Sequence, residues 1–505
     1  MLLEVEGSGG AVPSLWKISI LGGGPQKIVE NASGGVVSPV GFKIAFLRTA
    51  PGALEIWIAD SAGNNPRRIV EDAGPEGLTG SGSFITHPLY TGFGSRLAWS
   101  PGGNRIAYIR TFAPAYPDPT MDNKYALETV DIHDGTRRVL KESAQLRPAL
   151  SWSADGRLFY AYRDDASGDR NDAGIWSARV NEKSGAPEGD PRQITKGIGR
   201  IGGMTVTDDG KRLALWRSRT QPTVFVADFD PGTRHLKTPR RLTLDENMNV
   251  ASAWTPDSRA VLIASNRQGN WKLFRQDLDR ATPELVAEGS RNFIQQRLNP
   301  EGTEILYLTP YDPGDPQRLG DVKSVPLHGG TRRVILQGVS IGDIQCARFP
   351  SKLCFLITNS GSASNFVSFD PENGKTQPSA TFKIDRRLSS SLSPDGSQLA
   401  LVPSPGSKVI FMTISDRHTH EVELKGWAGL TTVDWTSNGK SVYVIAQTTN
   451  GTDEVVEVDP SGEHRVLLES DGHTHFWWAI QSPDSQHIMV QEVTGESNVW
   501  VVENF

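Results

Sequence analysis

The sequence contains no long apolar segment, since no run of about 18 consecutive apolar residues occurs in it and a membrane-spanning helix needs about 20. We therefore expect no insertion of this chain into a membrane. Residues 1–7 also lack the basic head and the apolar body of a signal peptide. The protein is then either cytoplasmic or part of a longer chain whose export signal lies elsewhere.

An excess of positive charge is also missing. The chain has 52 lysines and arginines against 58 aspartates and glutamates, which gives a formal net charge of -6. This balance provides no electrostatic attraction to nucleic acid or to an anionic membrane surface. We therefore expect the partner to be a protein or a small-molecule ligand, and not a nucleic acid.

Cysteine is scarce, with Cys346 and Cys354 as the only two residues of this type. They flank one predicted hairpin turn and could face each other across it, but a disulfide between paired strands is geometrically strained. We interpret them as two small buried apolar residues. Two cysteines say little about the redox compartment of the protein.

A nucleophile elbow of the Gly-x-Ser-x-Gly type is absent as well. The nearest segment, residues 495–499, ends in valine where the motif requires glycine, and it precedes a predicted strand. This argues against an intact peptidase of the prolyl-oligopeptidase type.

What the sequence does have is a short hairpin pattern that recurs about every 50 residues. Each copy consists of an apolar residue, a serine or threonine, a turn similar to Pro-Asp-Gly, and an apolar strand. In such a turn, proline sets the first corner, aspartate accepts hydrogen bonds from the turn amides, and glycine takes the positive-φ position. The clearest copies begin at Trp99, Trp152, Trp254 and Leu392.

Two further strands follow in most units. The third strand has an aromatic residue near its centre, as at Trp57, Trp176, Phe225, Phe274 and Trp500. The fourth begins with basic residues and continues with apolar ones, as in residues 67–70 and 240–243. A unit of four strands and about 40 to 50 residues is one blade of a β-propeller.

The number of units predicts an all-β fold of two tandem β-propellers with four-stranded antiparallel blades. Roughly eleven units occur, whereas one ring usually holds four to eight blades. We assign residues 1–239 to a first propeller and residues 240–505 to a second, which has six blades, or seven if it begins near Arg192. The last blade would use residues 499–502 as its third strand and residues 240–243 as its fourth. Because the chain opens in the middle of a blade, we expect the first propeller to be incomplete at its N-terminus and the chain to be a C-terminal fragment.

The Ser-Pro-Asp-Gly hairpin at residues 393–396, followed by an aromatic strand, resembles the WD40-like repeats of bacterial TolB-like β-propeller proteins. The resemblance covers nearly the whole chain and implies the fold rather than an activity, because propellers carry many unrelated sites. It also implies a periplasmic or other extracytoplasmic location, which the chain itself does not reveal. Propellers of this kind are often attached behind a protein-kinase or winged-helix domain, where they would act as the sensory or protein-binding part.

The loops that lead into the first strand of each blade form the usual recognition face of a propeller. Here they contain residue types that anchor interfaces or anionic groups, with solvated loop ends as the alternative interpretation. The candidate binding residues are Arg200, Asn247, Arg291, Phe293, Arg386, Arg387, Trp427, His473 and His475. The long segment 74–95 is a further candidate, either as a flap over the ring or as a disordered insert.

Two pairs of histidines have His-x-His spacing, His418 with His420 and His473 with His475. On a strand this spacing places both imidazoles on one face, as a metal site requires. The second pair is a weak metal candidate, because enzymes of the oligogalacturonate-lyase type share a TolB-like propeller and bind a metal through histidines. The other loops of the second ring contribute no histidine, so we expect no metal and no cofactor.

These observations favour a non-enzymatic module that binds a protein or a ligand, or serves as a scaffold, within a larger bacterial protein. The alternative is a propeller enzyme, either a metal-dependent polysaccharide lyase or the gating propeller of a serine peptidase of the prolyl-oligopeptidase type. The sequence does not name the ligand or the partner.

Overall fold

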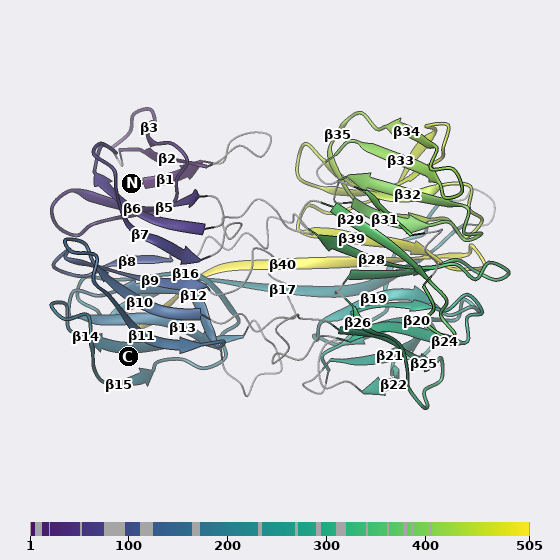
Figure 1. Cartoon of the computed structure of the whole chain (residues 1–505), viewed down its shortest axis with the longest axis horizontal. Coiled ribbons are helices and arrows are strands. Elements are labelled where there is room, and N and C mark those ends of the chain that lie inside the picture. The colour runs from purple at the N-terminus through teal and green to yellow at the C-terminus, as the bar shows by residue number, and fades with distance from the viewer. Residues whose placement is uncertain are drawn as a thin grey trace. The chain divides into compact units, whose positions relative to one another are not determined.

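The computed structural model describes residues 2–5, 13–19, 21–50, 53–74, 96–111, 125–163, 172–230, 235–267, 271–288, 294–309, 320–339, 342–360, 363–376, 381–384, 388–403, 406–503 and 505. These residues form strands, turns and bends, and no helix occurs among them. Nothing in the described part of the chain could therefore cross a membrane as a helix. The strands assemble into antiparallel sheets, most of them four-stranded (Figure 1). The predicted all-β fold, consistent with tandem β-propellers, is confirmed.

The chain divides into two compact units, residues 1–219 together with 496–505, and residues 220–495. In the first unit, consecutive strands form one sheet of three strands and three sheets of four, and a further sheet is shared with the second unit. These strands are β1 (Leu2–Val5), β2 (Ser14–Lys17), β3 (Gln26–Val29), β4 (Ser33–Val37), β5 (Lys43–Ala50), β6 (Ala53–Asp60), β7 (Arg67–Gly74), β8 (Leu97–Trp99), β9 (Arg105–Thr111), β10 (Tyr125–Asp131), β11 (Arg137–Ser143), β12 (Leu146–Trp152), β13 (Arg157–Arg163), β14 (Ala173–Val180), β15 (Pro187–Gln193) and β16 (Arg200–Val206).

The second unit repeats the same arrangement in five four-stranded sheets, each made of consecutive strands. Their strands are β19 (Asn249–Trp254), β20 (Ala260–Ser265), β21 (Lys272–Asp277), β22 (Glu284–Glu288), β23 (Ile294–Leu298), β24 (Glu304–Thr309), β25 (Gly320–Pro326), β26 (Arg333–Val339), β27 (Gly342–Cys346), β28 (Cys354–Ser360), β29 (Ala363–Phe369), β30 (Phe382–Ile384), β31 (Leu388–Leu392), β32 (Gln398–Pro403), β33 (Lys408–Thr413), β34 (Thr419–Glu423), β35 (Trp427–Trp435), β36 (Val442–Thr448), β37 (Asp453–Val458) and β38 (His464–Glu469).

The shared sheet has the order β16, β17 (Arg212–Asp228), β40 (His487–Glu503) and β39 (Thr474–Gln481), and β18 (Arg240–Arg241) pairs with β17. The two long strands β17 and β40 lie side by side (Figure 1) and each passes from one unit into the other. In the second unit the sheet therefore consists of β39, β40, β17 and β18. In the first unit it consists of β16, β17 and the last part of β40.

These long strands make the compact units differ from the predicted ranges 1–239 and 240–505. Residues 220–239 lie in the second unit, and residues 496–505 return to the first. The fourth strand at Arg240–Arg241 lies where we expected it, but its neighbour is β17, and not residues 499–502. The physical reason is that β17 and β40 each continue as one long strand, where we expected two shorter strands joined by a turn. The blade number of the second propeller stays a prediction.

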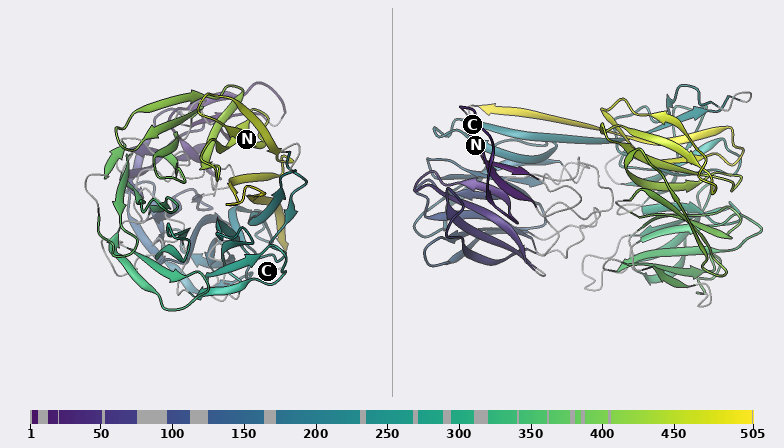
Figure 2. Two further views of the ribbon diagram at one scale, coloured as in Figure 1. Left: turned by 90° about the vertical axis from the view of Figure 1, so that its right-hand side faces the viewer. Right: turned by 90° about the horizontal axis from the view of Figure 1, so that it is seen from above.

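In the second unit the first strands of the sheets contact one another in succession, and β39 contacts β19. The sheets are arranged around a common axis (left panel of Figure 2). Tryptophans at the end of first strands join neighbouring sheets, since the Trp435 indole N–H donates to Ser391 O at 2.9 Å. The Trp254 indole on β19 donates in the same way to Ile480 O on β39 at 2.9 Å, which joins the first sheet of the series to the last.

The repeated turns are closed by the predicted hydroxyl and carboxylate. Thr255 Oγ1 donates to Asp257 Oδ1 at 2.6 Å, and Ser393 Oγ donates to Asp395 Oδ1 at 2.6 Å. Gly396 follows with a φ of 77°. Partial burial opposes the charge of Asp395, but hydrogen bonds from Ser393 and from Ser397 hold the pKa of its carboxyl below the ordinary value.

The interpretation of the two cysteines as separate buried residues is wrong. Cys346 on β27 and Cys354 on β28 are directly opposite each other, with their Cα atoms 4.1 Å apart, and form a disulfide. The pairing register of the hairpin brings the two thiols together, which their spacing allowed but did not require.

Candidate functional site

The structure describes five of the nine predicted binding residues. Arg200 begins β16 in the first unit, whereas Asn247, Trp427, His473 and His475 all lie in the second unit. Arg291, Phe293, Arg386 and Arg387 fall outside the described residues, as does nearly all of the segment 74–95. The candidate site is therefore built here from the second unit.

His475, the second residue of β39, is held by a buried carboxylate. Its Nδ1 lies 3.0 Å from Asp453 Oδ2, and the Asp453 side chain is only 2% exposed. The same oxygen accepts the backbone N–H of Phe476 at 3.0 Å, and Ser470 Oγ accepts the N–H of Asp453 at 2.9 Å. This contact fixes the plane of the imidazole ring.

Trp427, the first residue of β35, is oriented in a similar way. Its indole N–H donates to Glu454 Oε2 at 2.7 Å. Glu454 directly follows Asp453, so two successive residues at the start of β37 orient the two predicted aromatic side chains. Because successive side chains of a strand point to opposite faces, β37 positions Trp427 and His475 on different sides of its sheet.

His473 lies in the turn before β39 and is exposed. Asp471 closes this turn, since its Oδ1 accepts the N–H of His473 at 2.9 Å and the N–H of Thr474 at 2.8 Å. These hydrogen bonds lower the pKa of the Asp471 carboxyl. Glu492 on β40 is paired with Phe476 across the ladder. Burial and the negative charge of Asp471 raise the pKa of Glu492 to about 7.

Asn247 belongs to a polar cluster before β19. Asp245 Oδ1 accepts the Asn247 N–H at 2.9 Å and the Asn249 side-chain amide at 3.0 Å. The guanidinium of Arg267 lies 2.8 Å from Asp245 Oδ2 and donates to Asn249 Oδ1 at 2.9 Å. Sequence reasoning missed Arg267 because it follows β20 and does not belong to a loop that leads into a first strand.

Four ionisable residues on or beside first strands of the second unit were also missed. Arg297 on β23 has its Nη2 at 3.9 Å from Asp343 Oδ1 on β27. Burial raises the pKa of Asp434 on β35 to about 7, against the opposing charges of Arg297 and Arg348. Asp434 is nevertheless only half-buried. Protein surrounds its carboxyl group, but water still reaches it. The sequence repeat could have pointed to these residues, because Arg297 and Asp434 occupy the same repeat position, two residues before the turn.

Metal ligation by the histidines has little geometric support in the part of the chain that the structure describes, where no three His, Cys, Asp or Glu side chains gather as ligands. His473 and His475 differ in their surroundings, because the former is exposed in a turn and the latter contacts Asp453. In the other pair, His420 Nε2 lies 2.8 Å from Pro460 O.

Comparison with known proteins finds several similar propellers. Residues 92–282 match the family of the lipoprotein LpqB β-propeller domain. An uncharacterized protein of Agrobacterium fabrum is 22% identical over 253 residues, which are 43% of this chain and 78% of that protein. A putative TolB from Agrobacterium tumefaciens is 15% identical, with 55% of this chain and 99% of that chain covered and a TM-score of 0.42. An oligogalacturonate lyase in complex with manganese is 15% identical, with 53% and 77% covered and a TM-score of 0.36.

The repeated four-stranded sheets define the class of this chain as a β-propeller protein. Within that class, residues 92–282 are similar to the LpqB β-propeller family, and the repeats resemble those of bacterial TolB-like propellers.

Proposed function

We propose that this chain is a non-enzymatic binding module, the sensory or interaction part of a larger bacterial protein. Its binding surface is the loop face of the second unit, by which we mean the strand starts and preceding loops that contain Asn247, Trp427, His473 and His475. The predicted residues Arg291, Phe293, Arg386 and Arg387 belong to the same proposal, and Arg200 has the equivalent place in the first unit.

The observation that carries the proposal is the pair of contacts made by the start of β37. Asp453 fixes His475, and Glu454 fixes Trp427, at 3.0 Å and 2.7 Å. Side chains that are already ordered lose less conformational entropy when a partner binds. Tryptophan in particular contributes large contact areas at protein interfaces. Both side chains are therefore ordered before a partner binds, one on each side of the sheet that contains β37.

The test combines capture with turnover. Purified wild-type protein and the Trp427→Ala/His475→Ala variant are immobilised and exposed to a bacterial extract, and each captured protein or metabolite is identified by mass spectrometry and measured again in pure form. We expect the variant to bind the identified partner at least about tenfold more weakly. The matched control is His418→Ala, which removes an exposed histidine from the turn between β33 and β34.

The same preparations are incubated with oligogalacturonates, with and without Mn²⁺, and with short peptides. Turnover by the wild type that is lost in His473→Ala/His475→Ala would show an enzyme and overturn the proposal. Equal binding of the identified partner by the wild type and by Trp427→Ala/His475→Ala would exclude the loop face as the binding surface.

We further infer an extracytoplasmic, oxidising compartment such as the periplasm. The disulfide between Cys346 and Cys354 supports it, because disulfides persist where thiols are not kept reduced. The family matched by residues 92–282 is named for a lipoprotein. Alkylation of the protein as it is taken from cells tests this inference, since two freely reacting thiols would contradict it.

A further inference from the structure

A cluster of charged and amide side chains lies where first strands of the second unit end. Arg297 on β23, Gln345 on β27 and Asp434 on β35 each lie two residues before the hairpin turn that follows the strand. The loop face is formed at the starts of such strands, so this cluster lies at their other end. Asp343 shares the β27 face of Gln345, and Arg348 follows in the turn after β27. We call these five residues the end cluster.

One side of the Arg297 guanidinium is fixed by the backbone and the other is not. Its Nη1 donates to Ser252 O and to Gln296 O at 3.0 Å each. Its Nη2 lies 3.9 Å from Asp343 Oδ1, which is too long for a hydrogen bond. The side chain is 24% exposed, and no described residue accepts a hydrogen bond from Nη2. This nitrogen is therefore available to an acceptor from outside the chain.

Asp343 is held by its own strand and does not neutralise Arg297 through a direct hydrogen bond. Its Oδ1 accepts the N–H of Ile344 at 2.8 Å, and its Oδ2 accepts the side-chain amide of Gln345 at 3.0 Å. Gln345 is itself only 5% exposed and donates to Ser390 O on β31 as well. The position of the Asp343 carboxylate is thus determined by contacts other than its attraction to Arg297.

Arg348 brings a second guanidinium toward Asp434. From the turn after β27, its Nη1 donates to Ser437 O at 3.4 Å, and Ser437 follows Asp434 by three residues. Burial lowers the pKa of Arg348, and the charge of Asp434 opposes this shift. Arg348 forms no ion pair with any residue that the structure describes, although its side chain is exposed to solvent.

Asp434 also lacks an ion pair in the described part of the chain. Burial raises its pKa to about 7, against the charges of Arg297 and Arg348 and together with the charge of Asp343. The strands that contact β35 most are β31, β32, β36 and β39. None of these four strands contains an aspartate, glutamate, lysine or arginine.

Two further ionisable groups occur on those strands, Tyr443 on β36 and His475 on β39. His475 lies at the start of β39, the end that belongs to the loop face. Near neutral pH, the two guanidinium groups of the end cluster are therefore opposed by the carboxylate of Asp343 and by a carboxyl, Asp434, that is protonated about half of the time. The end cluster thus has a deficit of negative charge.

We propose that the end cluster binds a small carboxylate anion at Arg297 and Asp434, with Arg348 supplying further positive charge. A carboxylate accepts strong, charge-assisted hydrogen bonds from a guanidinium. The protonated carboxyl of Asp434 can donate to the same anion, and the bound anion in turn favours this protonated form. The two guanidinium groups disfavour a cationic ligand. This site is separate from the loop face, so either proposal can fail without the other.

The probe is sodium acetate, added to the full chain at constant ionic strength in an amine buffer and followed by saturation-transfer NMR of the acetate methyl group. We expect saturable binding with a Kd on the order of 1 mM, because each non-hydrogen atom of a very small ligand contributes at most about 1.5 kcal/mol. Methylammonium chloride is the cationic control and should not bind. Since acetate is ionised at both values, the proton on Asp434 should make binding about tenfold tighter at pH 6 than at pH 8.

Two variants test the location. Arg297→Gln should weaken acetate binding at least about tenfold, because it removes the charged donor. Asp434→Asn keeps a donor that does not titrate, so it should bind acetate equally well at pH 6 and at pH 8. Thermal unfolding checks that both variants fold, and the pH profile of Asp434→Asn decides if Arg297→Gln does not. Arg280→Gln, at a side chain 76% exposed, is the matched control and should bind like the wild type.

Three outcomes would overturn the proposal. They are no saturable binding by the wild type up to about 100 mM acetate, undiminished binding by a folded Arg297→Gln, and an unchanged pH dependence in Asp434→Asn. Binding of methylammonium would contradict the preference for an anion. The loop-face variant Trp427→Ala/His475→Ala should bind acetate like the wild type, which keeps the two tests distinct.

Discussion

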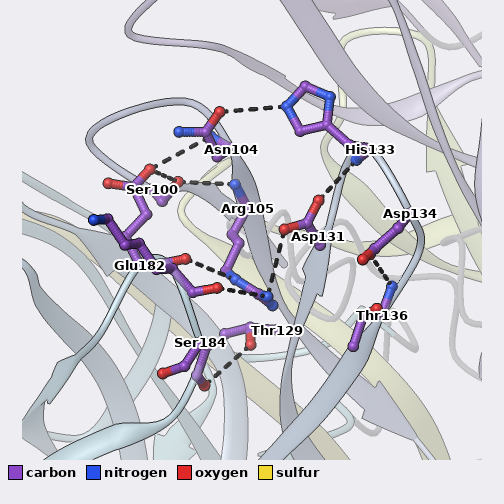
Figure 3. Close-up of polar contacts among 12 residues, drawn as sticks. Ser100, Asn104, Arg105, Thr129, Asp131, His133, Asp134, Thr136, Glu182 and Ser184 are labelled. Atoms are coloured by element: carbon purple, nitrogen blue, oxygen red, sulfur yellow. Dashed lines mark hydrogen bonds and ion pairs between the residues drawn. The ribbon is translucent and has the colours of Figure 1, made fainter.

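The hydroxyl of Ser100 donates a hydrogen bond of 2.5 Å to the carboxylate of Glu182, although the two residues belong to different sheets (Figure 3). Ser100 opens a repeat turn in which Gly102 stands where other copies have aspartate. Glu182, from the turn between β14 and β15, supplies the missing carboxylate and also accepts the Gly102 N–H at 3.1 Å. A side chain at position 102 would require the Glu182 carboxylate to move, since a Cβ there would lie 2.7 Å from Glu182 Oε1.

Glu182→Ala should therefore destabilise the first unit by about 1 to 3 kcal/mol, because it leaves the Ser100 hydroxyl and a turn amide without their acceptor. Adding Gly102→Asp to that variant should recover most of the loss by restoring the aspartate of the other turns. Gly102→Asp alone should be destabilising, since two carboxylates would then share one place. Urea unfolding of the four proteins measures the cycle, with the exposed Glu463→Ala as control. Additive effects of Glu182→Ala and Gly102→Asp on the free energy of unfolding would show that an aspartate at position 102 does not replace the carboxylate of Glu182.

The aspartates of the repeat turns predict a loss of stability in acid. Hydrogen bonds lower the pKa values of Asp257, Asp395 and Asp484, although partial burial opposes this shift. A carboxyl with a lowered folded-state pKa contributes stability above its unfolded pKa and loses it as the pH falls through the folded one. We expect the urea concentration at the unfolding midpoint to decrease when the pH is lowered below about 4. This decrease, taken relative to the value of the same protein at pH 7, should be smaller in Asp395→Asn. An identical acid dependence in that variant would exclude Asp395 as a contributor.

Asp434 should act in the opposite direction. Burial raises its pKa to about 7, so the folded state holds a proton that the unfolded state loses near pH 4. The wild type then loses stability as the pH rises from about 4 to about 7. Asp434→Asn should remove this loss and be more stable relative to the wild type at pH 8 than at pH 4. Unfolding curves at both values measure the difference. Asp416→Asn, an exposed carboxyl in a turn, is the control, and a difference that does not change with pH would refute the assignment.

Much of this architecture follows from local patterns in the sequence. The turn at residues 393–396 and the basic strand at Arg240–Arg241 were predictable because neighbouring residues determine a hairpin and its register. The continuation of β17 and β40 was not, because nothing in a short window distinguishes one 17-residue strand from two strands and a connection. Contacts between residues far apart in the sequence could not be predicted for the same reason. Asp453 lies 22 residues from His475, and Glu182 lies 82 residues from Ser100, so only the packing of neighbouring sheets reveals these contacts.

Gln491 provides a strong test of the way the second unit is closed. This side chain of β40 is 0% exposed and joins strands far apart in the sequence. Its Nε2 donates to Thr223 O and to Asn249 O at 3.0 Å each, and its Oε1 accepts the Ala251 N–H at 2.8 Å. Gln491→Leu preserves the size of the side chain but leaves these three backbone groups without that partner.

Each buried polar group that loses its partner costs about 1 to 3 kcal/mol, so we expect Gln491→Leu to lower the free energy of unfolding by several kcal/mol. The exposed neighbour in sequence, Gln486→Leu, should change it by less than about 0.5 kcal/mol. Hydrogen exchange offers a local measurement, because the amide of Ala251 should lose protection in Gln491→Leu while amides within β36 keep theirs. Retained protection at Ala251 would show that the closure of the second unit does not depend on Gln491.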